Sequence, residues 1–177
     1  MRRVSAAAFA ALALVLAPAG PVRAQDFAAA FSGFDTDSDA PIQIEADQLE
    51  VRDEEKVAIY SGKVRVRQGE TLLEAPALRV FYQGEATAAG VPGSEVSRIE
   101  AGPGVMVRSG DRTASGDSAV LDMASDIITM SGNVVLTEGE NVVRGERLIV
   151  NLATKQGRIE GGRVQTLITP SGAGKPQ

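Results

Sequence analysis

The chain has 177 residues, with 18 lysines and arginines against 23 aspartates and glutamates, no cysteine and no histidine. The acidic balance disfavours nucleic-acid binding, which depends on cations that neutralise phosphates. Without cysteine there is no disulfide or thiol chemistry, and without histidine the commonest general base and transition-metal ligand are missing. We therefore expect no catalytic residues, no metal site and no cofactor.

The N-terminus has the features of a secretory signal peptide. Arg2 and Arg3 precede an apolar run over 4–17, and a small-residue cleavage pattern ends at Ala24. The run is shorter than the roughly 20 residues that span a bilayer, which favours cleavage after Ala24 over a retained membrane anchor. We expect a mature chain that begins at Gln25 and is more negative than the full chain, whose net charge is -5.

The rest of the chain divides into a leader, a domain and a tail. Residues 25–40 are rich in alanine and then aspartate without a sustained period, which predicts a flexible leader. From residue 41 to 169 short strands with alternating apolar and polar residues follow one another. A long segment rich in glycine and alanine at 83–97 predicts a surface loop within this domain. No order is expected for residues 170–177.

One strand motif occurs twice, 70 residues apart. Each half of the motif is a short strand that ends in a glycine-containing turn. Two aspartates at matching positions indicate a structural role at such a turn, where they would accept backbone hydrogen bonds, rather than a catalytic pair of carboxylates. The ungapped matches include Asp47 with Asp117, Ser61-Gly62 with Ser131-Gly132, Val64 with Val134, Gly69-Glu70 with Gly139-Glu140, Leu78 with Leu148 and Val80 with Val150.

Requiring both copies to bury the same alternate positions identifies the inner face of the strands. A register shift by one residue would bury three cations, Lys63, Arg65 and Arg67, so the facing is well determined. The inner residues could form an ordinary core or a groove that binds an apolar ligand. The predicted inner set is Ile44, Leu49, Tyr60, Val64, Val66, Leu78, Val80, Val105, Val107, Met130, Val134, Leu136, Leu148 and Val150.

Evenly spaced strands with one aliphatic face are typical of a sandwich, a jelly roll or a solenoid. A stacked array ends in two open edges, and an open edge can accept a strand from a partner. The predicted edges are Ile42, Gln43, Ile44 and Glu45 at one end, and Val164, Gln165, Thr166, Leu167 and Ile168 at the other.

Three ordered segments resemble the LptA/OstA family of periplasmic lipopolysaccharide-transport proteins: residues 41–51, 60–66 and 75–80, with a second copy over 130–136 and 145–150. The resemblance implies an all-β fold, a twisted open β-jelly roll made of a folded antiparallel sheet with about 14–16 short strands. It also implies that the inner residues form a lipid groove for the acyl chains of lipopolysaccharide (lipid A). The partners would be an inner-membrane bridge protein, the outer-membrane translocon and further copies of the chain, joined head to tail.

Two other hypotheses remain open. An uncleaved N-terminus would make the chain an inner-membrane-anchored relative in the same pathway. A structural β-repeat protein that binds no lipid would have the same strand pattern. An enzyme is the least favoured class, because the sequence supplies neither an activated nucleophile nor a metal site.

Overall fold

A computed structural model describes residues 30–31, 40–84 and 96–169 of the chain. The predicted signal peptide, most of the predicted leader, the middle of the predicted loop and the predicted tail lie outside these residues. Within them the regular elements are β-strands, and no helix of this part of the chain has the length and apolar character to cross a membrane. The prediction of an all-β fold is therefore confirmed.

Twelve strands of the described residues form one antiparallel sheet. Four of these strands are long and the others are short. In chain order they are β1 (Ile42–Glu45), β2 (Gln48–Arg52), β3 (Val57–Gln68), β4 (Thr71–Tyr82), β5 (Val96–Ala101), β6 (Val105–Ser109), β7 (Arg112–Gly116), β8 (Ser118–Asp122), β9 (Ile127–Glu138), β10 (Asn141–Asn151), β11 (Gln156–Glu160) and β12 (Gln165–Leu167).

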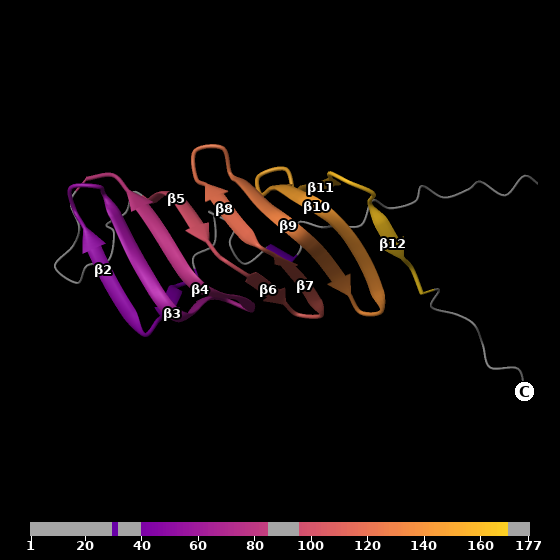
Figure 1. The fold of residues 1–177 in the computed structure, drawn as a ribbon, viewed down its shortest axis with the longest axis horizontal. Coiled ribbons are helices and arrows are strands. Elements are labelled where there is room, and N and C mark those ends of the chain that lie inside the picture. The colour runs from indigo at the N-terminus through magenta and orange to yellow at the C-terminus, as the bar shows by residue number, and fades with distance from the viewer. Residues whose placement is uncertain (1–29, 32–39, 85–95, 170–177) are drawn as a thin grey trace, which may run out of the picture.

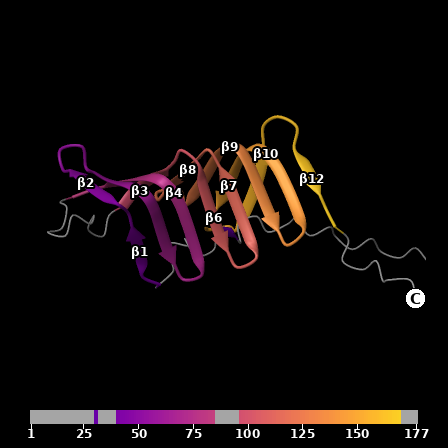
Figure 2. The same ribbon diagram turned by 60° about the horizontal axis from the view of Figure 1, so that its bottom comes forward.

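The sheet is folded into two layers because the four long strands pass from one layer into the other. The first half of β3 pairs with β2, whereas its second half pairs with β1. In the same way β4 pairs with β5 and β6, β9 with β8 and β7, and β10 with β11 and β12. Figures 1 and 2 show the resulting elongated, twisted and folded sheet. Its strands follow one another along the length of the sheet in chain order.

The predicted jelly roll of 14–16 short strands is confirmed in its architecture and differs in its strand count. Each half of β3, β4, β9 and β10 has the length and pairing of a separate short strand. The backbone nevertheless continues through the fold, so the described residues form twelve strands. Sequence alone does not show this continuity, because a glycine within β3, β9 and β10, and Pro76 within β4, look like the ends of strands.

Glycines in the left-handed region allow β3 and β9 to change layer. Gly62 has φ 80° and Gly132 has φ 78°, and the pairing of β3 with β4 shifts register between Ser61 and Val64. The backbone amide of Asp47 donates a hydrogen bond to the Gly62 carbonyl, at 2.9 Å, and that of Asp117 donates to the Gly132 carbonyl, also at 2.9 Å. The two repeated aspartates therefore lie at turns, as predicted, but their backbone amides donate these hydrogen bonds, whereas we expected the aspartates to accept them.

The residue after each of these glycines also has positive φ, 48° at Lys63 and 47° at Asn133. Asparagine tolerates this conformation better than lysine. The Asn133 side chain also donates a hydrogen bond from Nδ2 to Oδ2 of Asp117, at 3.0 Å. In the first copy Asp47 lies at the corresponding place beside Gly62.

We therefore expect Lys63→Asn to raise the free energy of unfolding by about 0.5–1 kcal/mol, through a better backbone fit and a new bond to Asp47. Urea denaturation measures this change, and Asn133→Lys is the matched reverse substitution, which should lower stability by a similar amount. An unfolding midpoint of the Lys63→Asn variant at or below that of the wild type would contradict the expectation.

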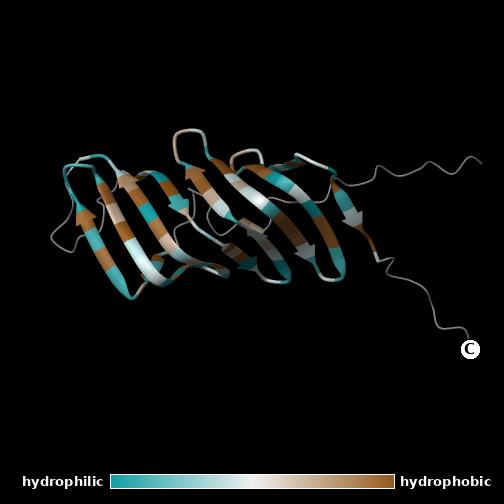
Figure 3. Cartoon of the chain, viewed as in Figure 1, coloured by the Kyte–Doolittle hydropathy of each residue, from teal (hydrophilic) through white to brown (hydrophobic). Residues whose placement is uncertain are grey.

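The predicted facing of the strands is confirmed by burial. In β3, Ala58, Tyr60, Val64 and Val66 are buried, and Lys63, Arg65 and Arg67 are exposed. In β9, the corresponding residues Ile128, Met130, Val134 and Leu136 are buried. Figure 3 shows the alternation of hydrophobic and hydrophilic residues along the long strands.

The segment predicted as a loop at 83–97 is shorter than expected. Strand β5 begins at Val96, so the last two residues of the predicted loop belong to the sheet. Ser97 is held there by a hydrogen bond from its Oγ to the Phe81 carbonyl, at 3.3 Å. The pairing of β4 with β5 shifts register between Phe81 and Tyr82, so that Val96 and Ile99 both line the interior although they are three residues apart. The start of the strand therefore has no regular apolar alternation in the sequence.

Candidate functional site

An apolar cavity of about 380 Å³ lies between the two layers in the N-terminal half of the sheet. This volume is in the range of small-molecule binding sites. The cavity is lined by Phe31, Ala40, Ile42, Ile44, Tyr60, Val66, Gln68, Leu73, Leu78, Val80, Val96, Ile99, Ala101, Val107, Ala119, Val120, Leu121, Met123 and Ile128.

None of the described residues that line the cavity carries a formal charge. Burial raises the pKa of the Tyr60 hydroxyl, so this side chain is neutral at physiological pH. Gln68 is buried, and its Nε2 donates a hydrogen bond to the Ala40 carbonyl, at 3.3 Å. The cavity can therefore hold an apolar group by burial, and it offers no group for acid, base or nucleophilic chemistry.

The predicted inner residues divide into three groups. Seven are buried in the core without lining the cavity, and Leu49 is exposed. The six that do line the cavity are Ile44, Tyr60, Val66, Leu78, Val80 and Val107. The seven in the core are Val64, Val105, Met130, Val134, Leu136, Leu148 and Val150.

Small residues on the inner face of β5 and β8 account for the position of the cavity. Ala101 and Ala119 are cross-strand partners there, and both line the cavity. In the C-terminal half the corresponding inner positions of β9 and β10 carry larger side chains, such as Met130 paired with Leu148. Both of those residues are 0% exposed, so the two layers are packed together at that level.

Leu49 was predicted to be an inner residue, but it is not buried. It lies directly opposite Tyr60 on β3 and so belongs to the inner face, yet its exposed fraction is 42%. Strand β2 pairs only with β3 among the described strands, so no strand lies beyond β2 to cover Leu49. Its exposure is a consequence of its position at the end of the sheet.

Several cavity residues are absent from the sequence-based set. Leu73 pairs with Val66, and Ile99 pairs with Val80 and Leu121. Alternation along β5 could have identified Ile99, which is two residues from Ala101. Alternation from Leu78 would have missed Leu73, because the register shift between β3 and β4 changes which alternate residues of β4 face inward. Ile42 was expected at a partner edge only, and it also lines the cavity. Phe31 has no periodic signal, because it lies outside the strands.

The predicted partner edges lie at the two ends of the sheet. Strand β1, the first predicted edge, pairs only with β3, and β2 pairs with the same strand in the other layer. At the opposite end β11 and β12 both pair only with β10. Each end of the described sheet therefore has two edge strands, of which the sequence predicted one.

The C-terminal edge is shorter than predicted. Only Gln165–Leu167 are in β12, whereas Val164 and Ile168 flank the strand. Apolar side chains are exposed at both ends: the exposed fractions are 58% for Ile42, 45% for Val164, and 62% for Leu167 and Ile168. Exposed apolar residues on open strands are typical of surfaces that pair with another chain.

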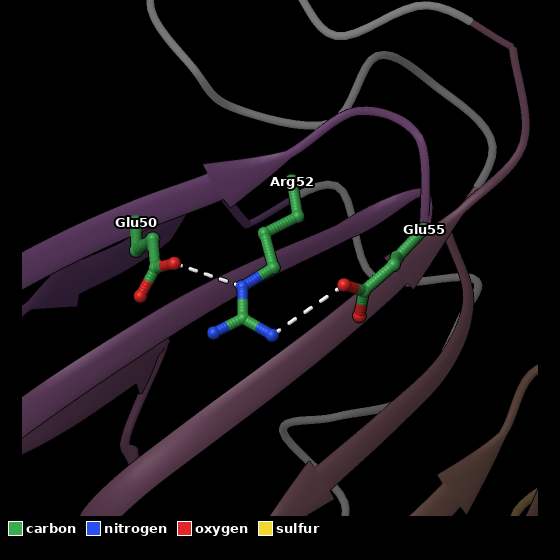
Figure 4. Close-up of polar contacts among 3 residues, drawn as sticks. All are labelled: Glu50, Arg52 and Glu55. Carbon is green, nitrogen blue, oxygen red and sulfur yellow. Dashed lines mark hydrogen bonds and ion pairs between the residues drawn. The ribbon is translucent and has the colours of Figure 1, made fainter.

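A charged cluster lies at the end of β2, at the N-terminal edge (Figure 4). The Arg52 guanidinium contacts Glu50 at 2.8 Å and Glu55 at 3.5 Å. The hydrogen bond and charge of Glu50, with the charge of Glu55, raise the pKa of Arg52. These side chains are exposed, so the cluster adds little stability, but it keeps polar groups on an edge strand.

The described residues contain no group of three or more histidine, cysteine, aspartate or glutamate side chains that could hold a metal ion. Some carboxylates of this part of the chain form ion pairs with arginines, as Glu74 does with Arg65 and Glu138 with Arg112.

The pKa of Tyr60 leads to a prediction about stability at alkaline pH. Burial raises it in the folded state, so the unfolded chain ionises first and stability falls as pH rises above about 10. We expect Tyr60→Phe to lose less stability than the wild type between pH 9 and pH 11. Tyr82, whose pKa is also raised by burial, is still present in this variant, so part of the dependence of stability on pH should remain. Parallel urea titrations would measure this, and identical pH profiles would contradict it.

Comparison with known proteins gives a consistent result. Residues 43–156 match the family model described as LptA/(LptD N-terminal domain) LPS transport protein. An uncharacterized protein of Rhizobium meliloti (strain 1021) is 37% identical over 150 residues, covering 83% of this chain and 81% of that protein. The lipopolysaccharide export system protein LptA of Escherichia coli (strain K12) is 26% identical over 144 residues, covering 76% and 74%.

A solved structure has the same fold. The crystal structure of LptH, the LptA homologous periplasmic component of the lipopolysaccharide transport device from Pseudomonas aeruginosa, superposes with a TM-score of 0.61 at 16% identity. The match covers 74% of this chain and 96% of that chain.

Proposed function

Because the chain belongs to the family of lipopolysaccharide-transport proteins that contains LptA and the N-terminal domain of LptD, we propose that it binds lipopolysaccharide in the periplasm and carries it between the membranes. Proteins of this family are transport proteins and not enzymes, in agreement with the prediction from the sequence. The acyl chains of the lipid would lie in the apolar cavity between the layers.

The observation that carries the proposal is the uncharged lining of the cavity. Burial of each methylene group contributes about 0.8 kcal/mol, without directional bonds. Such attachment is strong when summed over an acyl chain and still permits the chain to slide. The phosphates of the lipid would stay outside, because a buried anion without a cation is costly.

We also propose that the open edges join this protein to partners. Strands β1 and β2 at one end, and β11 and β12 at the other, would pair with the inner-membrane bridge protein, the outer-membrane translocon or further copies of the chain. The unpaired edge and the exposed Ile42, Leu167 and Ile168 support this. Head-to-tail pairing would extend the apolar groove from one copy to the next.

The test is to purify the protein gently from the periplasm and to analyse bound lipid by mass spectrometry. Copurifying lipopolysaccharide, and saturable binding of added lipopolysaccharide by the lipid-free protein, are the expected results. Failure of both would favour the alternative of a structural β-repeat protein that binds no lipid.

The position of the mature N-terminus separates the exported protein from an anchored relative. We expect N-terminal sequencing of periplasmic material to begin at Gln25. Intact Met1 recovered in the membrane fraction would favour the inner-membrane-anchored alternative.

A further inference from the structure

Two residues that precede the first strand are part of the core. Ala30 is 2% exposed and Phe31 is 1% exposed, and Phe31 is among the largest fully buried side chains of the described residues. They fall within the segment predicted as a flexible leader. In both Figure 1 and Figure 2 the short indigo segment of residues 30–31 lies near the middle of the long axis of the sheet.

The Phe31 side chain lines the same cavity as Tyr60, Val66 and Ile99. Its ring therefore occupies space next to the residues to which we assign the acyl chain. A second contact ties the chain to this cavity before β1, because buried Gln68 donates a hydrogen bond to the Ala40 carbonyl. The chain is thus held at the cavity at two separate points, Phe31 and Ala40.

Phe31 differs from the other aromatic residue of the cavity in how it is held. Tyr60 is fixed by the backbone pairing of β3 with β2 and β4, so it moves only if the sheet opens. Phe31 belongs to none of the strands of the sheet. Its withdrawal would cost mainly the burial of one apolar ring, which an entering acyl chain can replace with its own methylene groups.

We propose that Phe31 is an intramolecular competitor of the lipid: it fills part of the cavity when no ligand is bound and leaves when an acyl chain enters. This inference rests on the proposed function. The ring keeps apolar surface away from water in the empty protein. It also weakens the apparent affinity for lipid, because the binding-competent state is only a fraction of the population. A carrier that must pass its cargo on benefits from such weakening.

Tryptophan fluorescence gives a direct test, because the chain contains no tryptophan. In the full mature chain we expect the emission of Phe31→Trp to be blue-shifted without ligand and to shift to the red when lipopolysaccharide saturates the protein. Phe81→Trp is the control. Phe81 lies on β4 opposite Val57 and does not line the cavity, so its emission should stay constant. Solvent-like emission of Phe31→Trp without ligand would overturn the proposal.

Ligand affinity gives a second test. We expect Phe31→Ala to lower the Kd for lipopolysaccharide, and for the apolar dye N-phenyl-1-naphthylamine, by roughly tenfold. Phe81→Ala, which removes the same ring elsewhere, should leave both values unchanged. An unchanged or higher Kd of Phe31→Ala for the dye would overturn the proposal, as would a blue emission of Phe31→Trp that persists at saturating ligand.

The dye separates this inference from the proposed function. If no variant binds lipopolysaccharide, yet Phe31→Ala binds the dye more tightly and the dye shifts the emission of Phe31→Trp to the red, the competitor role stands and lipopolysaccharide is the wrong ligand. If lipopolysaccharide binds to wild type and Phe31→Ala with equal Kd, the proposed function stands and the competitor role is wrong.

Discussion

Val66→Asp should abolish lipopolysaccharide binding while the folded sheet is retained. Val66 is 7% exposed on β3 and lines the cavity, opposite Leu73. A carboxylate at this position would face the acyl chain without a cation, and desolvating it costs several kcal/mol. We expect the Kd for lipopolysaccharide to rise by at least about 100-fold.

Leu72→Asp is the matched control for this substitution. Leu72 lies on the outer face of β4, opposite Arg67 on β3 and Arg108 on β6, so the same introduced carboxylate meets two cations and no lipid. Circular dichroism and urea denaturation would establish that both variants fold. Val66→Trp, which fills the cavity without a charge, should also weaken binding. Equal binding by folded Val66→Asp and Leu72→Asp would contradict the assignment of the cavity.

Gly132→Ala should lower the free energy of unfolding by about 3 kcal/mol. Its φ of 78° costs a residue with a β carbon about 1–2 kcal/mol. The added β carbon would also overlap the carboxylate of Asp117, a residue held at the turn by a hydrogen bond from its backbone N–H to the Gly132 carbonyl. Relief of this overlap needs movement of the turn, at a cost of about 1–3 kcal/mol.

Gly139→Ala separates these two contributions. Gly139 also has positive φ, 55°, but an added β carbon there would meet no other atom within 4 Å. Its substitution should cost about 1 kcal/mol, from the backbone conformation alone. Urea denaturation measures both variants. If Gly132→Ala is no less stable than Gly139→Ala, the packing of Asp117 against Gly132 does not stabilise the change of layer.

Matching residues of the two copies of the motif have different surroundings in the structure. Leu136 is the second-copy counterpart of Val66, and both residues face inward and are 7% exposed, yet of the two only Val66 lines the cavity. A charge at Leu136 should therefore destabilise the fold, whereas a charge at Val66 should act on the ligand. The difference arises from the side chains in the opposite layer, which come from other strands.

The sequence by itself determined the all-β fold, the repeated motif and the facing of Val64, Val66, Val134 and Leu136. These features follow from local properties of the chain. Side chains alternate along a strand, and in β3 and β9 the same alternate positions are buried on both sides of the glycine, so the burial of one residue predicts that of the others. Glycines such as Gly62 and Gly132 mark the places where the backbone must turn.

Only the tertiary structure decided which inner residues line a cavity and which form the core. That division depends on Ala101 and Ala119 on neighbouring strands of one layer, and on larger pairs such as Met130 with Leu148 farther along the sheet. The burial of Phe31 likewise depends on strands that begin well after it in the chain. Whether space between two layers is filled is a property of side chains distant in sequence, and no local periodicity encodes it.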